Sequence, residues 1–250
     1  MTQVQRGAAA VRVQYRSVTD QPVDTTLDQA VLAELAGALP VREFRWYKGQ
    51  RHYSGWYWSS TMSGLVAYES RLELARIMLA DFDPSVTAIA GQPFRLIGAD
   101  GTRTRRHVPD ILLVMADGGA VVVDVKSPHK RDDPDVRAVM EWTRDIVGLR
   151  GWGFADWYGA SPDLLANVRF LAGYRRRAVI DESLIAVVRG AAGVPVAITD
   201  LERSVAADSV VVRPVILHLL WTGALVTDLD RPLDGLSMVA PREHMKAGRV

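Results

Sequence analysis

The chain has 250 residues, of which 48% are hydrophobic and 24% are charged, and its formal net charge is +1. These values fit a folded protein with one large or two small domains, and they exclude a strong overall field that would attract nucleic acid or a membrane. The absence of cysteine excludes disulfide bonds and cysteine-ligated zinc. No apolar run has the length of a membrane span, and the start lacks the layout of a secretory signal. The sequence therefore predicts a cytoplasmic protein without a membrane partner.

The first part of the chain is expected to form an extension, residues 1–39, with a strand at 12–18 and a short helix at 27–39. The aromatic-rich segment from Phe44 to Gly64 then predicts a hairpin of half-buried strands. Core and cross-strand packing is the favoured interpretation of these aromatic residues. A DNA-contacting surface is the alternative, and it depends on the interleaved residues Arg45, Lys48, Arg51 and His52.

Strands and helices alternate over the next hundred residues. Apolar residues at three- and four-residue steps predict a helix over 65–83, which Asp83-Pro84 ends. Strands are predicted at 85–98, within 103–116, and at 120–126, with a tight turn at 117–119. A helix at 133–152, a strand at 153–160 and a helix from Ser161 follow. This order predicts an α/β domain with a mixed sheet at 40–178.

The remaining residues have a different character. Short helices are predicted at 182–193 and at 210–223, and a third is predicted to begin at a capping box formed by Thr199 and Glu202. A hairpin is predicted at 224–239. Three short helices followed by a hairpin predict a small winged-helix domain at 179–242, and residues 243–250 form a tail.

The strongest chemical signal lies on the two strands that flank the turn at 117–119. Asp110 lies seven residues before Asp117, and Asp124 lies five residues after Gly119, so the two carboxylates are expected at the same end of the hairpin. Lys126 follows Asp124 by two residues and leaves the same face of the strand. Asp110, Asp124 and Lys126 are therefore predicted to converge.

Two carboxylates and a lysine suit phosphodiester hydrolysis. Mg²⁺ prefers carboxylate oxygens and water, and a bound cation can polarise a phosphate, with one or two ions both workable. A lysine beside the metal can orient or activate water. The alternative is an ordinary strand end at which Asp124 and Lys126 form a surface pair.

Five ordered elements resemble the PD-(D/E)XK nuclease superfamily and, within it, the TnsA-like endonuclease subunits of heteromeric Tns-type transposases. They are Ser70-Arg71-Leu72-Glu73, Phe82-Asp83-Pro84, Gln92-Pro93-Phe94, Pro109-Asp110 and Asp124-Val125-Lys126. The resemblance covers residues 60–130 well and extends more loosely to 175. It implies a restriction-endonuclease-like mixed sheet flanked by helices and followed by a winged-helix domain.

The resemblance also implies the roles of the site residues. Glu73, Asp110 and Asp124 would bind Mg²⁺, for which Mn²⁺ can substitute, and Lys126 would position or deprotonate water. Glu69, one turn before Glu73, is the rival for the helix carboxylate. The implied substrate is double-stranded DNA at transposon ends, cut at the 5′ ends, and the implied partners are a DDE-type transposase subunit and an AAA+ regulator ATPase.

Other residues are candidates for DNA contact. Arg103, Arg105, Arg106 and His107 could meet phosphates on either side of the scissile bond, or they could form a solvated hairpin flank. Gln92 is a candidate neighbour of Asp110, with a polar group at a strand edge as the alternative. Two rival functions stay open: a stand-alone restriction, repair or junction-resolving nuclease, and a non-catalytic winged-helix DNA-binding regulator.

Overall fold

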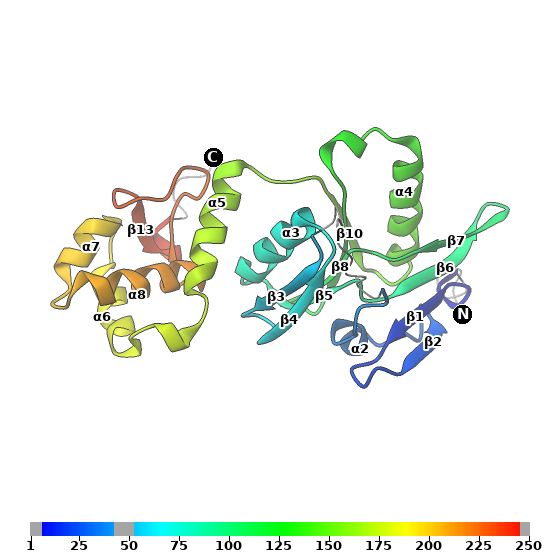
Figure 1. The fold of residues 1–250 in the computed structure, drawn as a ribbon, viewed down its shortest axis with the longest axis horizontal. Helices are drawn as coiled ribbons and strands as arrows, with labels where there is room; N and C mark the ends of the chain where they lie inside the picture. Colours follow the sequence, from blue (N-terminus) through cyan, green and yellow to red (C-terminus); the bar gives the residue numbers. More distant parts are fainter. Residues whose placement is uncertain (1–6, 43–52, 246–250) are drawn as a thin grey trace. The chain divides into compact units, whose positions relative to one another are not determined.

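The computed structural model describes residues 7–42 and 53–245, and side chains as far as residue 243. The chain divides into two compact units, Met1–Gly159 and Ala160–Val250. Each is described by itself (Figure 1). The mixed α/β composition expected from the sequence is confirmed. None of the helices in the described ranges is long and apolar enough to cross a membrane.

The central sheet of the first unit is mixed. Its order is β10-β9-β8-β5, with β9 antiparallel to β8 and parallel to β10. The bounds are β5 Val86–Gly91, β8 Ile111–Met115, β9 Ala120–Val125 and β10 Gly153–Trp157. Two helices pack on it, α3 (Arg71–Phe82) against β5, β8 and β9, and α4 (Pro134–Gly148) against β10. The apolar strand β9 is almost wholly buried, as its continuous valines predict.

A second sheet in this unit is antiparallel, with the order β2-β1-β6-β7. Its bounds are β1 Arg12–Arg16, β2 Pro22–Thr26, β6 Arg95–Asp100 and β7 Arg103–His107. Val13, Tyr15 and Leu96 lie in the same buried cluster as Trp142 of α4 and Val122 of β9. The predicted extension at 1–39 is therefore, over the described residues, an integral part of the first unit, because alternate apolar residues of β1 enter its core.

The strand predicted over 85–98 is two strands, one in each sheet. The break lies at Gln92, whose φ of 49° is in the left-handed region, and at Pro93, which has no backbone N–H to donate. Gln92 N donates to Asp110 O at 2.8 Å, while β6 turns away to pair with β1 and β7. Local pattern alone cannot show such a change of sheet, because both halves have strand-like composition.

The aromatic hairpin consists of β3 (Gly55–Ser59) and β4 (Gly64–Tyr68). Phe44 and the basic residues Arg45, Lys48, Arg51 and His52 lie outside the described residues. The helix predicted over 65–83 begins only at Arg71, because residues 64–68 pair with β3 and Ser70 caps the helix. The helix predicted at 27–39 is shorter, α2 (Leu32–Ala36).

The described part of the second unit contains five α-helices and a three-stranded sheet of order β11-β13-β12, on which α7, α8 and α9 pack. Its elements are α5 Pro162–Leu171, α6 Ile185–Ala191, α7 Ile198–Ser204, α8 Ser209–Trp221, β11 Val196–Ala197, β12 Leu225–Val226, β13 Met238–Pro241 and α9 Arg242–Met245. Short 3₁₀ turns occur in this unit at Ala172–Tyr174, Arg177–Val179 and Glu182–Leu184, and another occurs in the first unit at Pro128–Lys130.

Two expectations for this region are corrected. The boundary between units falls after Gly159 rather than after 178, because α5 packs on α8 and Asn167 Nδ2 donates to Leu229 O and Arg231 O. The predicted capping box is not formed. Thr199 Oγ1 donates to Gly235 O, and α7 begins after Ala197 without a side-chain cap.

Candidate active site

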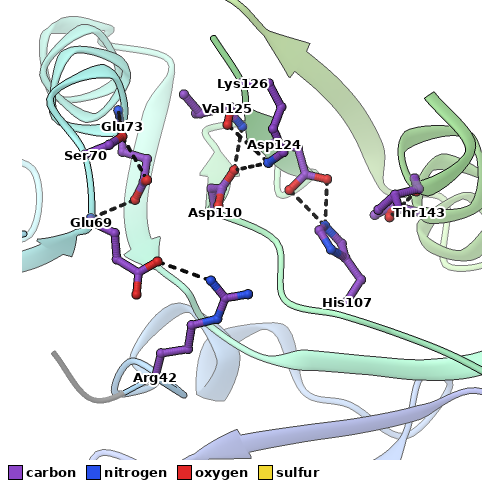
Figure 2. Close-up of polar contacts among 11 residues, drawn as sticks. Arg42, Glu69, Ser70, Glu73, His107, Asp110, Asp124, Val125, Lys126 and Thr143 are labelled. Atoms are coloured by element: carbon purple, nitrogen blue, oxygen red, sulfur yellow. Dashed lines mark hydrogen bonds and ion pairs between the residues drawn. The ribbon is translucent and has the colours of Figure 1, made fainter. Parts of the chain in front are cut away.

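Asp110 and Lys126 meet at one end of the β8–β9 hairpin. Antiparallel pairing of Ile111 with Val123 brings Asp110, just before β8, beside the end of β9. Lys126 Nζ lies 3.0 Å from Asp110 Oδ2, and Val125 N donates to the same oxygen at 2.7 Å (Figure 2). Both strand ends are thereby joined through a single buried carboxylate.

The charge of Lys126 is set by its neighbours. Burial alone would lower its pKa, but attraction to Asp110, Asp124 and Glu73 outweighs burial and raises the pKa above its ordinary value. All three predicted carboxylates thus lie within electrostatic reach of one ammonium group. Lys126 Nζ also donates to Val125 O at 3.1 Å. In the protein without a bound metal, Lys126 is a cation and not a free amine.

Asp124 has a partner that the sequence analysis did not assign. Its side chain is 0% exposed, and its two oxygens lie 2.9 Å and 2.7 Å from Nε2 of His107 on β7. The sequence placed His107 only in a basic stretch, because β7 and β9 belong to different sheets. The available signal was the alternation along β7, which puts His107 and Arg105 on its less exposed side.

Glu73 enters from the first turn of α3. Its Oε2 accepts from Glu69 N at 2.9 Å, its Oε1 accepts from Ser70 Oγ at 2.9 Å, and its own N–H donates to Ser70 Oγ at 3.0 Å. This reciprocal bonding caps the helix. Burial, and then the charge of Asp110, raise the pKa of Glu73 to about 7. Glu73 therefore belongs to the acidic cluster and also stabilises the start of α3.

The rival helix carboxylate is directed elsewhere. Glu69 Oε2 lies 3.2 Å from a guanidinium nitrogen of Arg42, and both side chains are partly exposed. Figure 2 shows this pair apart from the group formed by Asp110, Asp124 and Lys126. The geometry favours Glu73 over Glu69 as the helix member of the site.

The candidate DNA-binding residues separate into different environments. Arg103 Nε and Arg105 Nε donate to Asp100 Oδ2 at 2.9 Å and 2.7 Å, and these bonds, that of Arg105 first, lower the pKa of Asp100. Arg106 lies on the other face of β7, since side chains alternate along a strand. Of the three arginines, the structure leaves Arg106 without a carboxylate partner among the described residues.

Gln92 lies directly beside Asp110, through the bond from its backbone N–H to Asp110 O. Its side chain is buried, and neither polar atom of its amide has a hydrogen-bond partner among the residues that the structure describes. A buried amide without partners costs folding free energy. A left-handed backbone at the same residue adds to that cost. Such features are concentrated at functional sites.

The donor chemistry fits a hard divalent cation. Asp110 and Asp124 offer carboxylate oxygens from adjacent strands. The pKa of Asp110 is raised, chiefly by burial and additionally by the charge of Asp124, although Lys126 opposes the shift. A cation would relieve this repulsion. Mg²⁺ commonly takes one or two carboxylates and completes its shell with water.

The side chains are not arranged as a ready ligand cluster. Among the side chains that the structure describes, no group of three or more His, Asp or Glu residues could hold a metal ion. The reason is visible in the hydrogen bonds, because Glu73 faces Ser70 and Asp124 faces His107. In the protein without a bound metal these two carboxylates therefore have other partners, and a cation held by Asp110 and Asp124 would compete with His107 for the oxygens of Asp124.

Comparisons with known proteins give no family for this chain. No family model matches it, and no curated protein matches it. The crystal structure of protein VC1899 from Vibrio cholerae resembles a part of it, with a TM-score of 0.25 and 15% sequence identity over 40% of this chain and 30% of that chain. The chain thus spans less than a third of that protein, and a similarity of this degree does not show a shared fold.

Proposed function

We propose that the chain is a metal-dependent DNA endonuclease of the PD-(D/E)XK type. One observation carries the proposal: beside the end of β9, Lys126 Nζ lies 3.0 Å from Asp110 Oδ2 and is also attracted by the charge of Asp124. A buried carboxylate with a raised pKa beside a cationic lysine, as for Asp110 and Lys126, is typical of functional sites.

Each residue has a distinct role in the proposed reaction. Asp110 and Asp124 would hold Mg²⁺ or Mn²⁺, which supplies a Lewis acid for the phosphate and a more acidic water. Lys126 stabilises negative charge on the phosphate and orients the attacking water. In the protein without a bound metal, the pKa of Lys126 is raised and the side chain carries a positive charge. Glu73 orients water at the edge of the acidic cluster.

The finer fold assignments are part of this proposal. A mixed sheet with α3 and α4 packed on it supports a restriction-endonuclease-like domain. The order α6, β11, α7, α8, β12 and β13, with β12 and β13 paired antiparallel, supports a winged-helix domain.

The biological role proposed is that of a TnsA-like subunit. It would cut the 5′ ends of a transposon while a DDE-type transposase subunit handles the other strand and an AAA+ ATPase regulates both. The five ordered sequence elements support this role. A stand-alone nuclease would use the same residues, so genes for a DDE transposase and an ATPase beside this gene would favour the transposon role.

A nicking assay tests the nuclease proposal. The full chain is incubated with supercoiled plasmid and Mg²⁺ or Mn²⁺, alone and together with the transposase subunit encoded beside it. Asp110→Asn and Lys126→Met are expected to lower nicking by a hundredfold or more, on the order of the loss caused by removing one transition-state contact. Asp145→Asn and Lys130→Met are matched controls, since both side chains are exposed and lie outside the cluster.

The outcome also separates the rival functions. Metal-dependent nicking that both site variants lose excludes a non-catalytic regulator. Nicking that survives Asp110→Asn refutes the proposed site, and a wild-type chain that stays inactive with its partner present refutes the proposed function.

A further inference from the structure

The antiparallel sheet of the first unit has one buried face and one outer face. Val13, Tyr15 and Leu96 are buried in the core cluster. Directly paired residues of neighbouring strands share a face, and the register pairs Arg12 with Ile97 and Ile97 with Arg106. The outer face is thus formed by the intervening residues of β2, β1, β6 and β7. They include Arg12, Gln14, Arg16, Asp24, Arg95 and Arg106.

Positive charge is concentrated on this outer face. Arg12 is paired with Asp24, and Arg16 Nε donates to Asp20 at 2.7 Å. Arg95 and Arg106 form no ion pair within the described residues. The four arginines of this face, together with the paired Asp24 and Asp20, have a net charge of +2. The whole chain of 250 residues has a net charge of +1. The face is therefore more basic than the average surface.

The two unpaired arginines are close together. Gln14 of β1 pairs with Arg95 of β6, and Arg12 pairs with Ile97. Because Ile97 also pairs with Arg106 of β7 and lies two residues after Arg95, Arg95 and Arg106 are diagonal neighbours. Diagonal neighbours in an antiparallel sheet lie about 7–8 Å apart. Two guanidinium groups at this spacing can reach neighbouring phosphates of one nucleic-acid strand, and each can bind a phosphate with two hydrogen bonds.

The same face carries a cleft. The cleft has a volume of about 460 Å³, and its lining includes Gln14, Arg16, Val41 and Arg95. Val41 N donates to Gln92 O at 3.0 Å, and Gln92 N donates to Asp110 O at 2.8 Å. Two backbone hydrogen bonds thus link Val41, at the wall of the cleft, through Gln92 to the backbone carbonyl of Asp110.

We propose that the outer face of the sheet β2-β1-β6-β7 binds the phosphate backbone of duplex DNA, with Arg95 and Arg106 as its contact residues. The inference rests on the proposed nuclease function and concerns how the duplex is anchored, since His107, which contacts Asp124, lies on the opposite face of β7. It takes the place of the candidates Arg103 and Arg105, which share the carboxylate of Asp100 on the opposite side of the hairpin. Phosphate contacts of this kind position a duplex without reading its sequence.

The test measures DNA binding separately from cleavage. The full chain is titrated into a fluorescent duplex in EDTA, and anisotropy is recorded at several salt concentrations. Arg95→Ala combined with Arg106→Ala is expected to weaken binding about tenfold at about 0.1 M salt and to reduce the slope of log K against log salt by about 1.8. Arg103→Ala combined with Arg203→Ala removes the same charge from residues already paired with aspartates, and it should leave both quantities nearly unchanged.

Two results would overturn the proposal: no duplex binding by the wild-type chain at low salt, or equal losses in the two double variants. DNA binding by the variant Asp110→Asn distinguishes failure of this proposal from failure of the nuclease proposal. If that variant binds DNA like the wild type while the Arg95 and Arg106 variant does not, the surface is established whether or not the plasmid is nicked.

Discussion

Nε2 of His107 lies 2.7 Å and 2.9 Å from the two carboxylate oxygens of Asp124 and so joins the end of β7 to the end of β9. These strands belong to different sheets. The contact therefore holds the arginine-bearing sheet against the strand that carries Asp124 and Lys126. It also supplies the polar partner that a fully buried carboxylate needs.

Replacing His107 by alanine leaves the carboxylate of Asp124 buried without this partner. An unsatisfied buried group costs about 1–3 kcal/mol, so His107→Ala should lower the free energy of unfolding by that amount in urea denaturation at pH 7. His129→Ala is the control, because His129 is exposed. Equal stability of His107→Ala and the wild type would show that Asp124 does not depend on the histidine.

Glu73 makes the stability of the protein depend on pH. Its pKa of about 7 exceeds the ordinary 4.5, so between these values the folded state holds a proton that the unfolded chain has released. Stability therefore falls as pH rises through this window, and the loss is complete above pH 7. Glu73→Gln removes the penalty and should be more stable than the wild type by about 1–2 kcal/mol at pH 8.5, allowing for one weakened hydrogen bond.

The same comparison at pH 4.5 should show little or no advantage for Glu73→Gln, because Glu73 is then protonated when folded. Glu69→Gln is the control, since Glu69 faces Arg42 and not Asp110. Thermal unfolding at the two pH values measures both variants. A difference between Glu73→Gln and the wild type that is independent of pH would contradict the effect assigned to burial and to the charge of Asp110.

Asp81 ties α3 to the β3–β4 hairpin. Its carboxylate accepts from Tyr57 Oη at 2.8 Å, Ser59 Oγ at 2.6 Å and Thr61 N at 2.8 Å. Asp81→Asn keeps the shape but converts one acceptor oxygen into a donor group. It should lower the free energy of unfolding by about 2–3 kcal/mol. Asp83→Asn, two residues on and exposed, should change stability much less, and similar losses in both would argue against a special role for Asp81.

Replacing the side-chain amide of Gln92 by an apolar group should stabilise the fold. Its amide is buried and has no partner within residues 7–42 and 53–243, and methionine has a similar length and shape without polar donors. Gln92→Met is therefore expected to raise the free energy of unfolding by about 1 kcal/mol while reducing nicking. Calorimetry and the plasmid assay test the two effects. A clear loss of stability would show that the amide is satisfied by bound water.

Much of the site could be predicted because the β8–β9 hairpin is local. The turn at 117–119 pairs two neighbouring segments, so spacing along the chain was enough to bring Asp110 to the end of β9 that carries Lys126. The early start predicted for α3 was wrong because residues 64–68 pair with β3, and a helical period of apolar residues does not reveal a competing strand partner.

The sequence by itself determined the strand alternation, the tight turn, and the residue types at the end of the hairpin, since these depend on neighbours within a few residues. Only the tertiary structure decided the partner of Asp124, the unpaired amide of Gln92, and the face of the sheet on which Arg106 lies. Each depends on a contact between segments remote in the chain. The register of such contacts is set by the packing of the whole core, and no local pattern encodes it.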